Sequence, residues 1–369
     1  MYNYAIGLDK FEIDTPALLL DLDKLDYNVE AMAQFFEGQE ADLRPHMKTH
    51  KSPIISHRQI KAGAIGVTCQ KTGEAEVMAR SGIDDILIAN EVVGKRKVRR
   101  VANLAKTVDL KVAVDSERNV KELGKAARAK RSNVGVLVEI NLGMDRCGVP
   151  PGEPALKLAR KVHDEGGLSF LGIMGYEGHA VFIESFEERK QQTEKALEKE
   201  IETKELLESS GLECQIVTSG ATGTYDITGT YPGVTEVEAG TYATMDLKYG
   251  TVEGVDDGFK QAVTLLATVI SRPTDDRAIL DLGMKAVTHD KGKPSLLNIN
   301  GATVDCFAEE HTYLNVLDRE AGQKLQLGEK VELIPSHGCT TINLHDHYFC
   351  TRDGKVEAVW PIEARGKFV

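Results

Sequence analysis

Hydrophobic residues in the first two-thirds of the chain follow two alternating patterns. Short runs rich in β-branched and other apolar residues are typical of buried parallel strands, and segments with apolar residues every three or four positions are typical of amphipathic helices. The apolar runs predict strands at 43–48, 63–69, 85–90, 111–115, 134–140, 170–176, 214–220 and 235–242. The segments with helical spacing predict helices at 21–36, 52–62, 73–82, 95–106, 119–130, 154–166 and 184–211.

Eight strands with helices between most of them predict an α/β fold, a (β/α)8 TIM-type barrel. A doubly wound open sheet is the alternative, but no GxGxxG follows the first strand, which counts against a dinucleotide-binding domain. After about residue 255 short strands separated by turn residues replace the helical pattern. These strands are predicted at 262–273, 276–284, 330–338, 347–354 and 355–362. The sequence therefore predicts a barrel domain over 1–255 and a C-terminal all-β domain over 256–369.

Composition narrows the class of protein. The 369 residues are 41% hydrophobic and 28% charged, which is ordinary for a globular chain with a sizeable core. A formal net charge of −12 argues against nucleic acid or an anionic membrane as the main partner. No apolar run is long enough to cross a bilayer, and no signal peptide is recognisable. Six cysteines without a CxxC pair indicate reduced thiols and a cytoplasmic protein.

Polar residues follow most of the predicted strands, where barrel enzymes carry their active sites. The basic segment RPHMKTHKSP, residues 44–53, places Lys48 at the end of the first strand. Taken alone this segment would be a solvated basic loop, and Lys48 and Lys51 ordinary loop lysines. Comparable positions after later strands are held by Gln70, Arg146, Tyr176 with His179, Ser219 and Thr241. These residues are therefore candidates for one site at the barrel mouth.

The seventh and eighth strands run into loops of small and hydroxyl residues, SGATGT (219–224) and AGTY (239–242). Such loops let backbone N–H groups approach an anion, and barrels often bind phosphate at these two positions. A lysine at one strand end with a phosphate site across the mouth suggests pyridoxal phosphate (PLP) bound to Lys48 as a Schiff base.

The chain resembles the fold-type III PLP enzymes, and within them the D-threonine aldolase and D-serine dehydratase-like family. The matching motifs occur in order over nearly the whole chain: DTPALLLDLDKLDYN, RPHMKTHKSP, GVTCQKTGEAEVM, DILIANEV, INLGMDRCGV, SGATGTY, EAGTYATMD, SHGCTTINLHDHY and VEAVWPIEARG. The resemblance implies an alanine-racemase-like barrel joined to a β-domain. It also implies a homodimer in which the β-domain of the partner completes the site.

The resemblance assigns roles to the candidates. Lys48 matches the Schiff-base lysine, Arg146 an arginine near the ring hydroxyl of PLP, and Gln70 and Tyr176 residues that line the cofactor. The predicted phosphate-binding loops contribute Ser219, Thr222, Gly223, Thr224, Gly240, Thr241 and Tyr242. His179 is the candidate for an additional catalytic base.

The family also carries a divalent metal in its β-domain, and SHGCTTINLHDHY is the matching segment. His337 and Cys339 are two positions apart, so on an extended strand both side chains would face the same way. An isolated HxC is usually structural, but a histidine and a thiolate suit zinc, with Mn, Co or Mg as alternatives. His345, Asp346 and His347 follow as groups that could support the metal ligands or lie on the surface.

Two reactions remain open for a β-hydroxy D-amino acid substrate such as D-serine, D-threonine or 3-hydroxy-D-aspartate. β-Elimination gives a keto acid and ammonia, and retro-aldol cleavage gives glycine and an aldehyde. Aldolases of the family have an aspartate as second metal ligand and a histidine six residues beyond the tyrosine that ends the sixth strand. Here Cys339 and Phe182 occupy these positions, which favours β-elimination.

Two further classes fit less well. An amino-acid racemase needs a second base on the opposite face of the cofactor ring, and no tyrosine can be assigned to that role. A non-catalytic PLP homeostasis protein would share the barrel but lack residues 256–369.

Overall fold

The computed structural model describes residues 3–369. Contacts divide the chain into two compact units. We call Glu30–Lys48, Pro53–Gly240 and Gly366–Val369 the barrel unit. The remainder, Met1–Val29, Thr49–Ser52 and Thr241–Arg365, forms the β unit. Among the described residues no helix is both long enough and apolar enough to cross a membrane.

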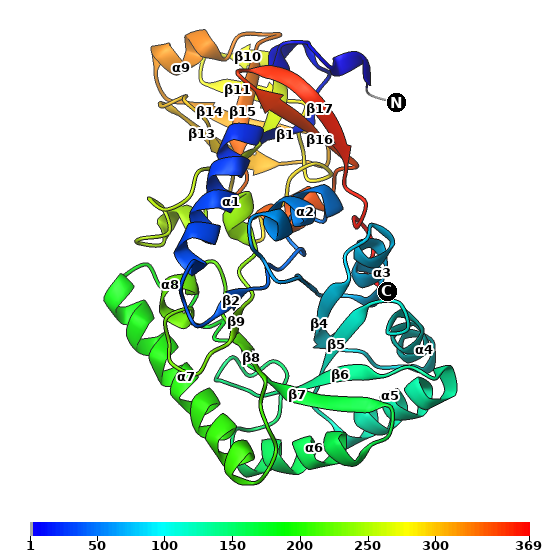
Figure 1. The fold of residues 1–369 in the computed structure, drawn as a ribbon. Coiled ribbons are helices and arrows are strands. Elements are labelled where there is room, and N and C mark those ends of the chain that lie inside the picture. Colours follow the sequence, from blue (N-terminus) through cyan, green and yellow to red (C-terminus); the bar gives the residue numbers. More distant parts are fainter. Residues whose placement is uncertain (1–2) are drawn as a thin grey trace. The chain divides into compact units, whose positions relative to one another are not determined.

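The barrel unit contains an eight-stranded parallel sheet in the order β2-β9-β8-β7-β6-β5-β4-β3 (Figure 1). Its strands are β2 (Asp42–Leu43), β3 (Val67–Cys69), β4 (Asp85–Glu91), β5 (Asp109–Val114), β6 (Val134–Glu139), β7 (Leu168–Met174), β8 (Ile216–Ser219) and β9 (Glu236–Val237). The sheet closes because residues 43–47 also pair with the β3 side: Ile65 N donates to Leu43 O at 3.0 Å and Met47 N to Thr68 O at 2.9 Å. The predicted barrel is confirmed.

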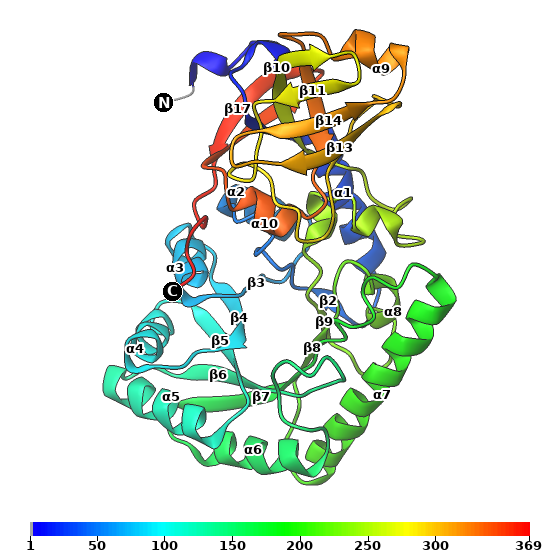
Figure 2. The ribbon, with the colours of Figure 1, turned by 180° about the vertical axis from the view of Figure 1, so that it is seen from behind.

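Helices between the strands cover the outside of this sheet (Figures 1 and 2). They are α2 (Pro53–Lys61), α3 (Thr72–Arg80), α4 (Lys95–Leu104), α5 (Glu117–Lys130), α6 (Glu153–Asp164), α7 (Phe186–Ser209) and α8 (Tyr225–Thr228), while α1 (Leu22–Phe36) passes from the β unit into the barrel unit. The sequence sets their ends locally. The Ser116 side chain caps α5 by accepting from Asn119 N, and Pro154 stands in the first turn of α6.

The barrel interior combines apolar and ionic packing. Leu87, Ala89, Ala113, Leu137 and Met174 form one apolar cluster. Charged side chains form a second cluster, in which the buried Arg44 binds the carboxylates of Glu236 and of the half-buried Asp85, and Lys111 lies 2.7 Å from Asp85. Because Arg44 is only 1% exposed, removal of its partners would leave an unpaired charge inside the protein.

The β unit is built on a nine-stranded sheet with the central order β13-β14-β11-β10-β1-β16-β17, in which β15 pairs with β10 and β12 (Figure 2). Its strands are β1 (Ala17–Asp21), β10 (Val263–Thr274), β11 (Arg277–Leu280), β12 (Ser295–Leu296), β13 (Ala302–Phe307), β14 (Thr312–Val316), β15 (Lys330–Ile334), β16 (His347–Arg352) and β17 (Lys355–Pro361). Short helices are α9 (Arg319–Lys324), α10 (Gly338–Ile342) and the 3₁₀ turns Asn3–Ala5, Lys10–Glu12, Thr241–Ala243 and Tyr249–Thr251. The predicted β-rich C-terminal region is confirmed.

One strand of this sheet, β1, comes from the N-terminal segment and was not predicted. It pairs antiparallel with β10 and parallel with β16, so that Leu19 lies opposite Thr264 on one side and Phe349 on the other. Its side chains are buried on both faces, which explains the unbroken apolar run ALLL. Contacts therefore group the N-terminal segment with the C-terminal strands. The predicted domain boundary between residues 255 and 256 stays a prediction.

Candidate active site

The basic segment 44–53 is not a solvated loop. Arg44, His46, His50 and Lys51 are 1%, 4%, 0% and 7% exposed. In the barrel unit, the Nε2 atom of His46 lies 3.1 Å from the Oε1 atom of Gln70. In the β unit, the hydroxyl of Tyr348 donates to the carbonyl of His50 at 2.7 Å. The ionisable residues crowd here because the segment forms part of the barrel wall and then enters the β unit.

Lys48, Tyr176 and Arg146 meet in the barrel unit. The ammonium of Lys48 lies 5.8 Å from the centre of the Tyr176 ring, and the guanidinium of Arg146 lies 5.4 Å from the same centre. Two cationic residues predicted from different strand ends therefore lie beside the ring of a third predicted residue, Tyr176. The amide of Gln70 is fixed nearby in the sheet because its Nε2 atom donates to Ala89 O at 3.0 Å.

A buried carboxyl, Glu238, accompanies Lys48. Burial raises the pKa of Glu238 to about 7, and the positive charge of Lys48 and a hydrogen bond from Thr218 oppose this rise. The sequence analysis did not single out Glu238, although it lies inside the eighth predicted strand, 235–242, in the run EVEAG. A lysine near an acidic group and an aromatic ring fits a site that takes up a charged cofactor.

Two hydroxyls of the predicted phosphate loop have partners inside the protein. The hydroxyl of Ser219 donates to Glu200 at 2.6 Å, and that of Thr224 donates to Glu177 at 2.6 Å. Both carboxylates are buried, and Glu177 also accepts from Thr228 and from the backbone N–H of Gly220. The direct role of Ser219 and Thr224 toward phosphate stays a prediction.

The glycines of these loops are required by close packing. A Cβ atom on Gly223 would lie 2.0 Å from Val181 O, and one on Gly240 would lie 2.4 Å from His46 O. Thr222, which precedes Gly223 in the loop after β8, is buried. Thr241 and Tyr242 belong to the β unit, where the Tyr242 ring packs 5.6 Å from that of Phe259. Their role toward phosphate also stays a prediction.

His337 and Cys339 do not lie on an extended strand, so that part of the prediction is wrong. Strand β15 ends at Ile334, His337 stands at the N-cap of α10, and Cys339 lies in its first turn. The helical turn nevertheless brings the imidazole and the thiol within hydrogen-bonding reach of each other. The hydroxyl of Thr49 lies 3.1 Å from the Cys339 sulfur.

Negatively charged and polar neighbours stabilise the protonated form of His337, and a metal ion would have to displace that proton. Burial of His337 disfavours its charged form, but hydrogen bonds and charge from Cys339 and Asp290 outweigh burial and raise the pKa of His337 to about 9. Asp290 Oδ2 lies 2.6 Å from the Nδ1 atom of His337. A nitrogen and a sulfur donor side by side, with a carboxylate on the other ring nitrogen, form a donor set that fits zinc.

Asp290 was not found from the sequence, because it lies in the irregular segment 285–294 without a periodic pattern. The three residues predicted to support the metal ligands have other contacts. His345 Nε2 lies 2.7 Å from Ala286 O, Asp346 pairs with Arg365, and His347 begins β16.

His179 is exposed and lies in the loop after β7. A Cβ atom on Gly143 would lie 3.4 Å from its ring, so His179 rests against the loop that precedes Arg146. Phe182, in the same loop, is half-buried. The geometry leaves His179 available to solvent at the barrel mouth.

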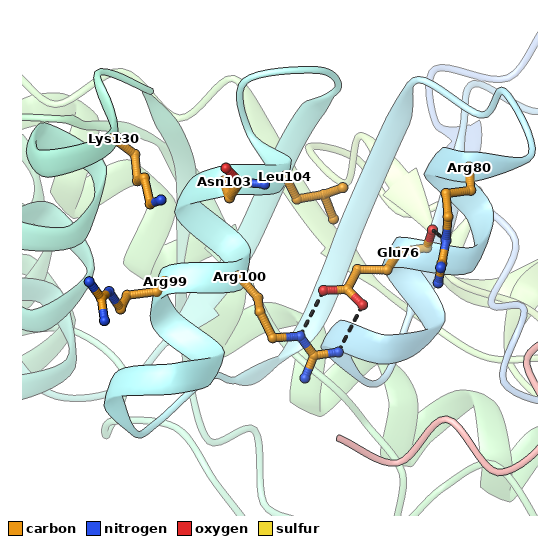
Figure 3. A pocket seen from close by; sticks show the side chains of 7 residues that line it. All are labelled: Glu76, Arg80, Arg99, Arg100, Asn103, Leu104 and Lys130. Carbon is orange, nitrogen blue, oxygen red and sulfur yellow. Dashed lines mark hydrogen bonds and ion pairs between the residues drawn. The ribbon is translucent and has the colours of Figure 1, made fainter.

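A hollow lies between α3, α4 and α5, away from the strand ends (Figure 3). Its volume is about 480 Å³, and its lining residues are Glu76, Arg80, Arg99, Arg100, Asn103, Leu104 and Lys130. Two guanidinium nitrogens of Arg100 bind the Glu76 carboxylate at 2.7 and 2.9 Å. It contains none of the predicted site residues.

Comparisons with known proteins agree with the geometry. The family model described as the alanine racemase N-terminal domain matches residues 20–248, and one described as a serine dehydratase domain matches residues 262–351. The chain is 38% identical to a D-threonine aldolase from Arthrobacter sp, with 96% of this chain and 93% of the relative covered. It is 31% identical to a D-threo-3-hydroxyaspartate dehydratase from Delftia sp., with 89% and 92% covered.

Solved structures give the same result. A D-threonine aldolase from Filomicrobium marinum superposes with a TM-score of 0.94 at 38% identity, covering 98% of each chain. Two mutants of D-threo-3-hydroxyaspartate dehydratase, a histidine-to-alanine form and a cysteine-to-alanine form that is metal-free, superpose with TM-scores of 0.88 and 0.86 at 28% and 26% identity. They cover 96% of this chain, and 96% and 98% of their own. The chain therefore belongs to the fold-type III PLP family, in the branch that joins an alanine-racemase-type barrel to a serine dehydratase domain.

Proposed function

We propose that this protein is a lyase that depends on PLP and a divalent metal and acts on β-hydroxy D-amino acids. The observation that carries the proposal is the position of Lys48 and Arg146 beside the ring of Tyr176 in the barrel unit. The pair His337 and Cys339 in the β unit supports it. The relatives are named as aldolases and dehydratases of such amino acids.

The barrel unit would hold the cofactor. Lys48 would bind it covalently, Arg146 would face its ring hydroxyl, and Tyr176 and Gln70 would line it. Phosphate would be held by the loops that contain Ser219, Thr222, Gly223, Thr224, Gly240, Thr241 and Tyr242. When bound, PLP supplies an electron sink for negative charge at Cα of the substrate. The ε-amino group of Lys48 would then remove or return the proton at Cα.

The β unit would hold the metal through the His337 imidazole and the Cys339 thiolate. Two protein ligands leave positions open for substrate, as a catalytic metal requires, and zinc is favoured over Mn, Co or Mg by the sulfur donor. When bound, the metal polarises the β-hydroxyl of the substrate as a leaving group. Asp290 would fix the ring of His337 in the orientation that ligation needs.

β-Elimination to a keto acid and ammonia is the favoured reaction. The observation behind it is the identity of the metal pair. In the dehydratase relative the mutated histidine and cysteine are two positions apart, as His337 and Cys339 are here, and the cysteine mutant is metal-free.

Retro-aldol cleavage to glycine and an aldehyde is the second candidate. It is favoured by overall similarity, since identity to the D-threonine aldolase is 38% and identity to the dehydratase is 31%. In this case His179, exposed in the loop after β7, is the first candidate for the base that takes the hydroxyl proton.

Product analysis tests the proposal. The holoenzyme with zinc or manganese is incubated with D-threonine, D-serine and 3-hydroxy-D-aspartate, and with L-threonine and the Lys48→Ala variant as controls. Keto acid and ammonia support elimination, whereas glycine and an aldehyde support the aldolase. Absence of both product pairs from all three D-substrates would rule out the proposed lyase.

We also propose a cytoplasmic homodimer. The six cysteines form no disulfide in the part of the chain that the structure describes, which fits a reducing compartment. Light scattering of the purified holoenzyme should give twice the 40.4 kDa chain mass, and a monomer with full activity would contradict the shared site.

A further inference from the structure

Three neighbouring barrel strands end in carboxylates. Glu91 is the last residue of β4, Asp115 follows the last residue of β5, and Glu139 is the last residue of β6. The three strands are parallel and adjacent, with β5 in the middle. Parallel strands end at the same edge of a sheet, so these acids stand on the edge where barrels carry their active sites.

Two of these acids, Glu91 and Glu139, lie close together. One carboxylate oxygen of Glu91, one of Glu139 and the sulfur of Cys147 all lie within 4.8 Å of one another. Glu139 is 5% exposed, and the Oε1 atom of Glu91 is also buried. Two ionised carboxylates would repel each other strongly in such a place, and one proton between them removes most of that repulsion.

Arg146 is the cation beside the pair. Its positive charge acts on Glu139, and both residues line one small cavity of about 10 Å³ together with Cys147 and Tyr176. The same guanidinium lies 5.4 Å from the centre of the Tyr176 ring. One arginine balances one negative charge, which is the charge of two carboxyl groups that hold a single proton.

We propose that Glu139 and Glu91 share one proton and that this singly charged pair positions Arg146. Glu139 is thus a positioning residue, which acts through Arg146 and not on the substrate. The shared proton is inferred from the proximity of Glu91, Glu139 and Cys147 alone. The effect of Arg146 positioning on PLP binding rests on the proposed function.

The ionisation of the surrounding groups agrees with this arrangement. Burial, and then a hydrogen bond and the negative charge of Glu91, raise the pKa of Glu139 to about 9, while Arg146 opposes the rise and Asp115 adds to it. Burial and the charge of Glu91 raise the pKa of Cys147 to about 11, which leaves a neutral thiol at neutral pH. Burial also raises the pKa of Asp115.

Infrared spectroscopy of the holoenzyme tests the shared proton without any reaction. A protonated buried carboxyl has a carbonyl band that carboxylates lack. Wild-type protein should show such a band at neutral pH, lose it as pH rises through the pKa of about 9, and lack it in Glu139→Gln. In Glu91→Gln the band should disappear at lower pH, because a neighbouring negative charge no longer raises the pKa.

Glu200→Gln is the matched control, since Glu200 is another buried carboxyl with a raised pKa that should have its own band. It should remove that band and leave the Glu139 band in place. A neutral-pH spectrum of Glu139→Gln identical to that of the wild type would overturn the proposal. A second metal equivalent per chain that disappears in Glu139→Gln would overturn it as well.

Cofactor binding tests the positioning of Arg146. Glu139→Ala should weaken PLP retention in equilibrium dialysis and lower kcat/KM by about 100-fold, the size expected when a positioned group shifts by roughly 1 Å. Glu139→Gln should keep most of the PLP retention and most of the kcat/KM of the wild type, because an amide keeps the hydrogen bond of the protonated acid. Equal losses in the two variants would contradict the positioning role. If Glu139 and Glu91 share a proton but the protein has no lyase activity, the proposed function is refuted and the shared proton is not.

Discussion

The Nδ1 atom of His337 lies 2.6 Å from the Oδ2 atom of Asp290, so one nitrogen of the ring is already bound to a carboxylate. Thr340 reinforces the contact, with its hydroxyl 2.9 Å from Asp290 Oδ1. A carboxylate in this position fixes the orientation of a metal-binding imidazole and increases its basicity. The geometry thus places the Nδ1 nitrogen of His337 against a carboxylate, while the same ring lies within hydrogen-bonding reach of Cys339.

Asp290→Ala should therefore weaken metal binding by about 10- to 100-fold without changing the fold. The reason is that His337 loses the partner that orients it. Competition with a chromophoric zinc chelator measures the effect. Asp305→Ala, which removes an exposed carboxylate from β13, is the control and should bind metal as the wild type does. Equal affinity in Asp290→Ala and wild type would show that the ring needs no such support.

The two lysines of the basic segment should differ in cofactor chemistry. Lys48 lies beside the Tyr176 ring, whereas Lys51 belongs to the β unit, with a backbone φ of 53° and a carbonyl that accepts from Ala364 N. Lys48→Ala should abolish the imine absorption band of the holoenzyme, and Lys51→Ala should retain it. Borohydride reduction followed by peptide mass spectrometry identifies the modified lysine. An adduct on Lys51 in the wild type would contradict the assignment.

The sequence predicted the barrel because its strands are short, apolar and buried on both sides, a pattern that local periodicity captures. Strand β1 shows where such reasoning ends. Its apolar run ALLL precedes the first predicted helix, but its partners β10 and β16 lie more than two hundred residues away. Pairing over such a separation leaves no local signal, so the N-terminal segment could not be assigned to the β unit in advance.

The same distinction holds for the site. Lys48, Arg146 and Tyr176 could be predicted because each follows a strand, and topology alone brings strand ends together. Asp290 could not, since it lies on an irregular segment that meets His337 only in the folded chain. Glu91 lies one position beyond the predicted strand 85–90, and Glu139 lies near the end of the predicted strand 134–140. Their proximity depends on the sheet order, in which β5 alone separates β4 from β6, and the chain order of the barrel strands already contains that order.

Arg44 should be essential for stability. Its Nε and Nη2 atoms each lie 2.8 Å from a Glu236 oxygen inside the barrel, and Arg44→Met would leave that carboxylate buried and unpaired. We expect a loss of about 3–5 kcal/mol in the free energy of unfolding by urea. Arg118→Met, which breaks an exposed pair with Glu122, should cost at most about 1 kcal/mol. If Arg44→Met is as mild as Arg118→Met, the buried ion pair adds little to stability.

Glu200 should make stability depend on pH. Burial raises its pKa well above the usual 4.5, opposed by a hydrogen bond from Ser219. The folded protein therefore keeps a proton that the unfolded chain releases above pH 4.5, and the contribution of this group to stability falls as pH rises from there.

Glu200→Gln removes that proton linkage. The variant should gain stability relative to the wild type as pH increases above the unfolded pKa, and the two curves should converge in acid. Urea unfolding at a series of pH values measures the difference. Glu205→Gln, an exposed position on the same helix, is the control and should follow the wild type throughout. A constant offset for Glu200→Gln, independent of pH, would mean that Glu200 is ionised in the folded protein and that Ser219 and its neighbours stabilise the charge.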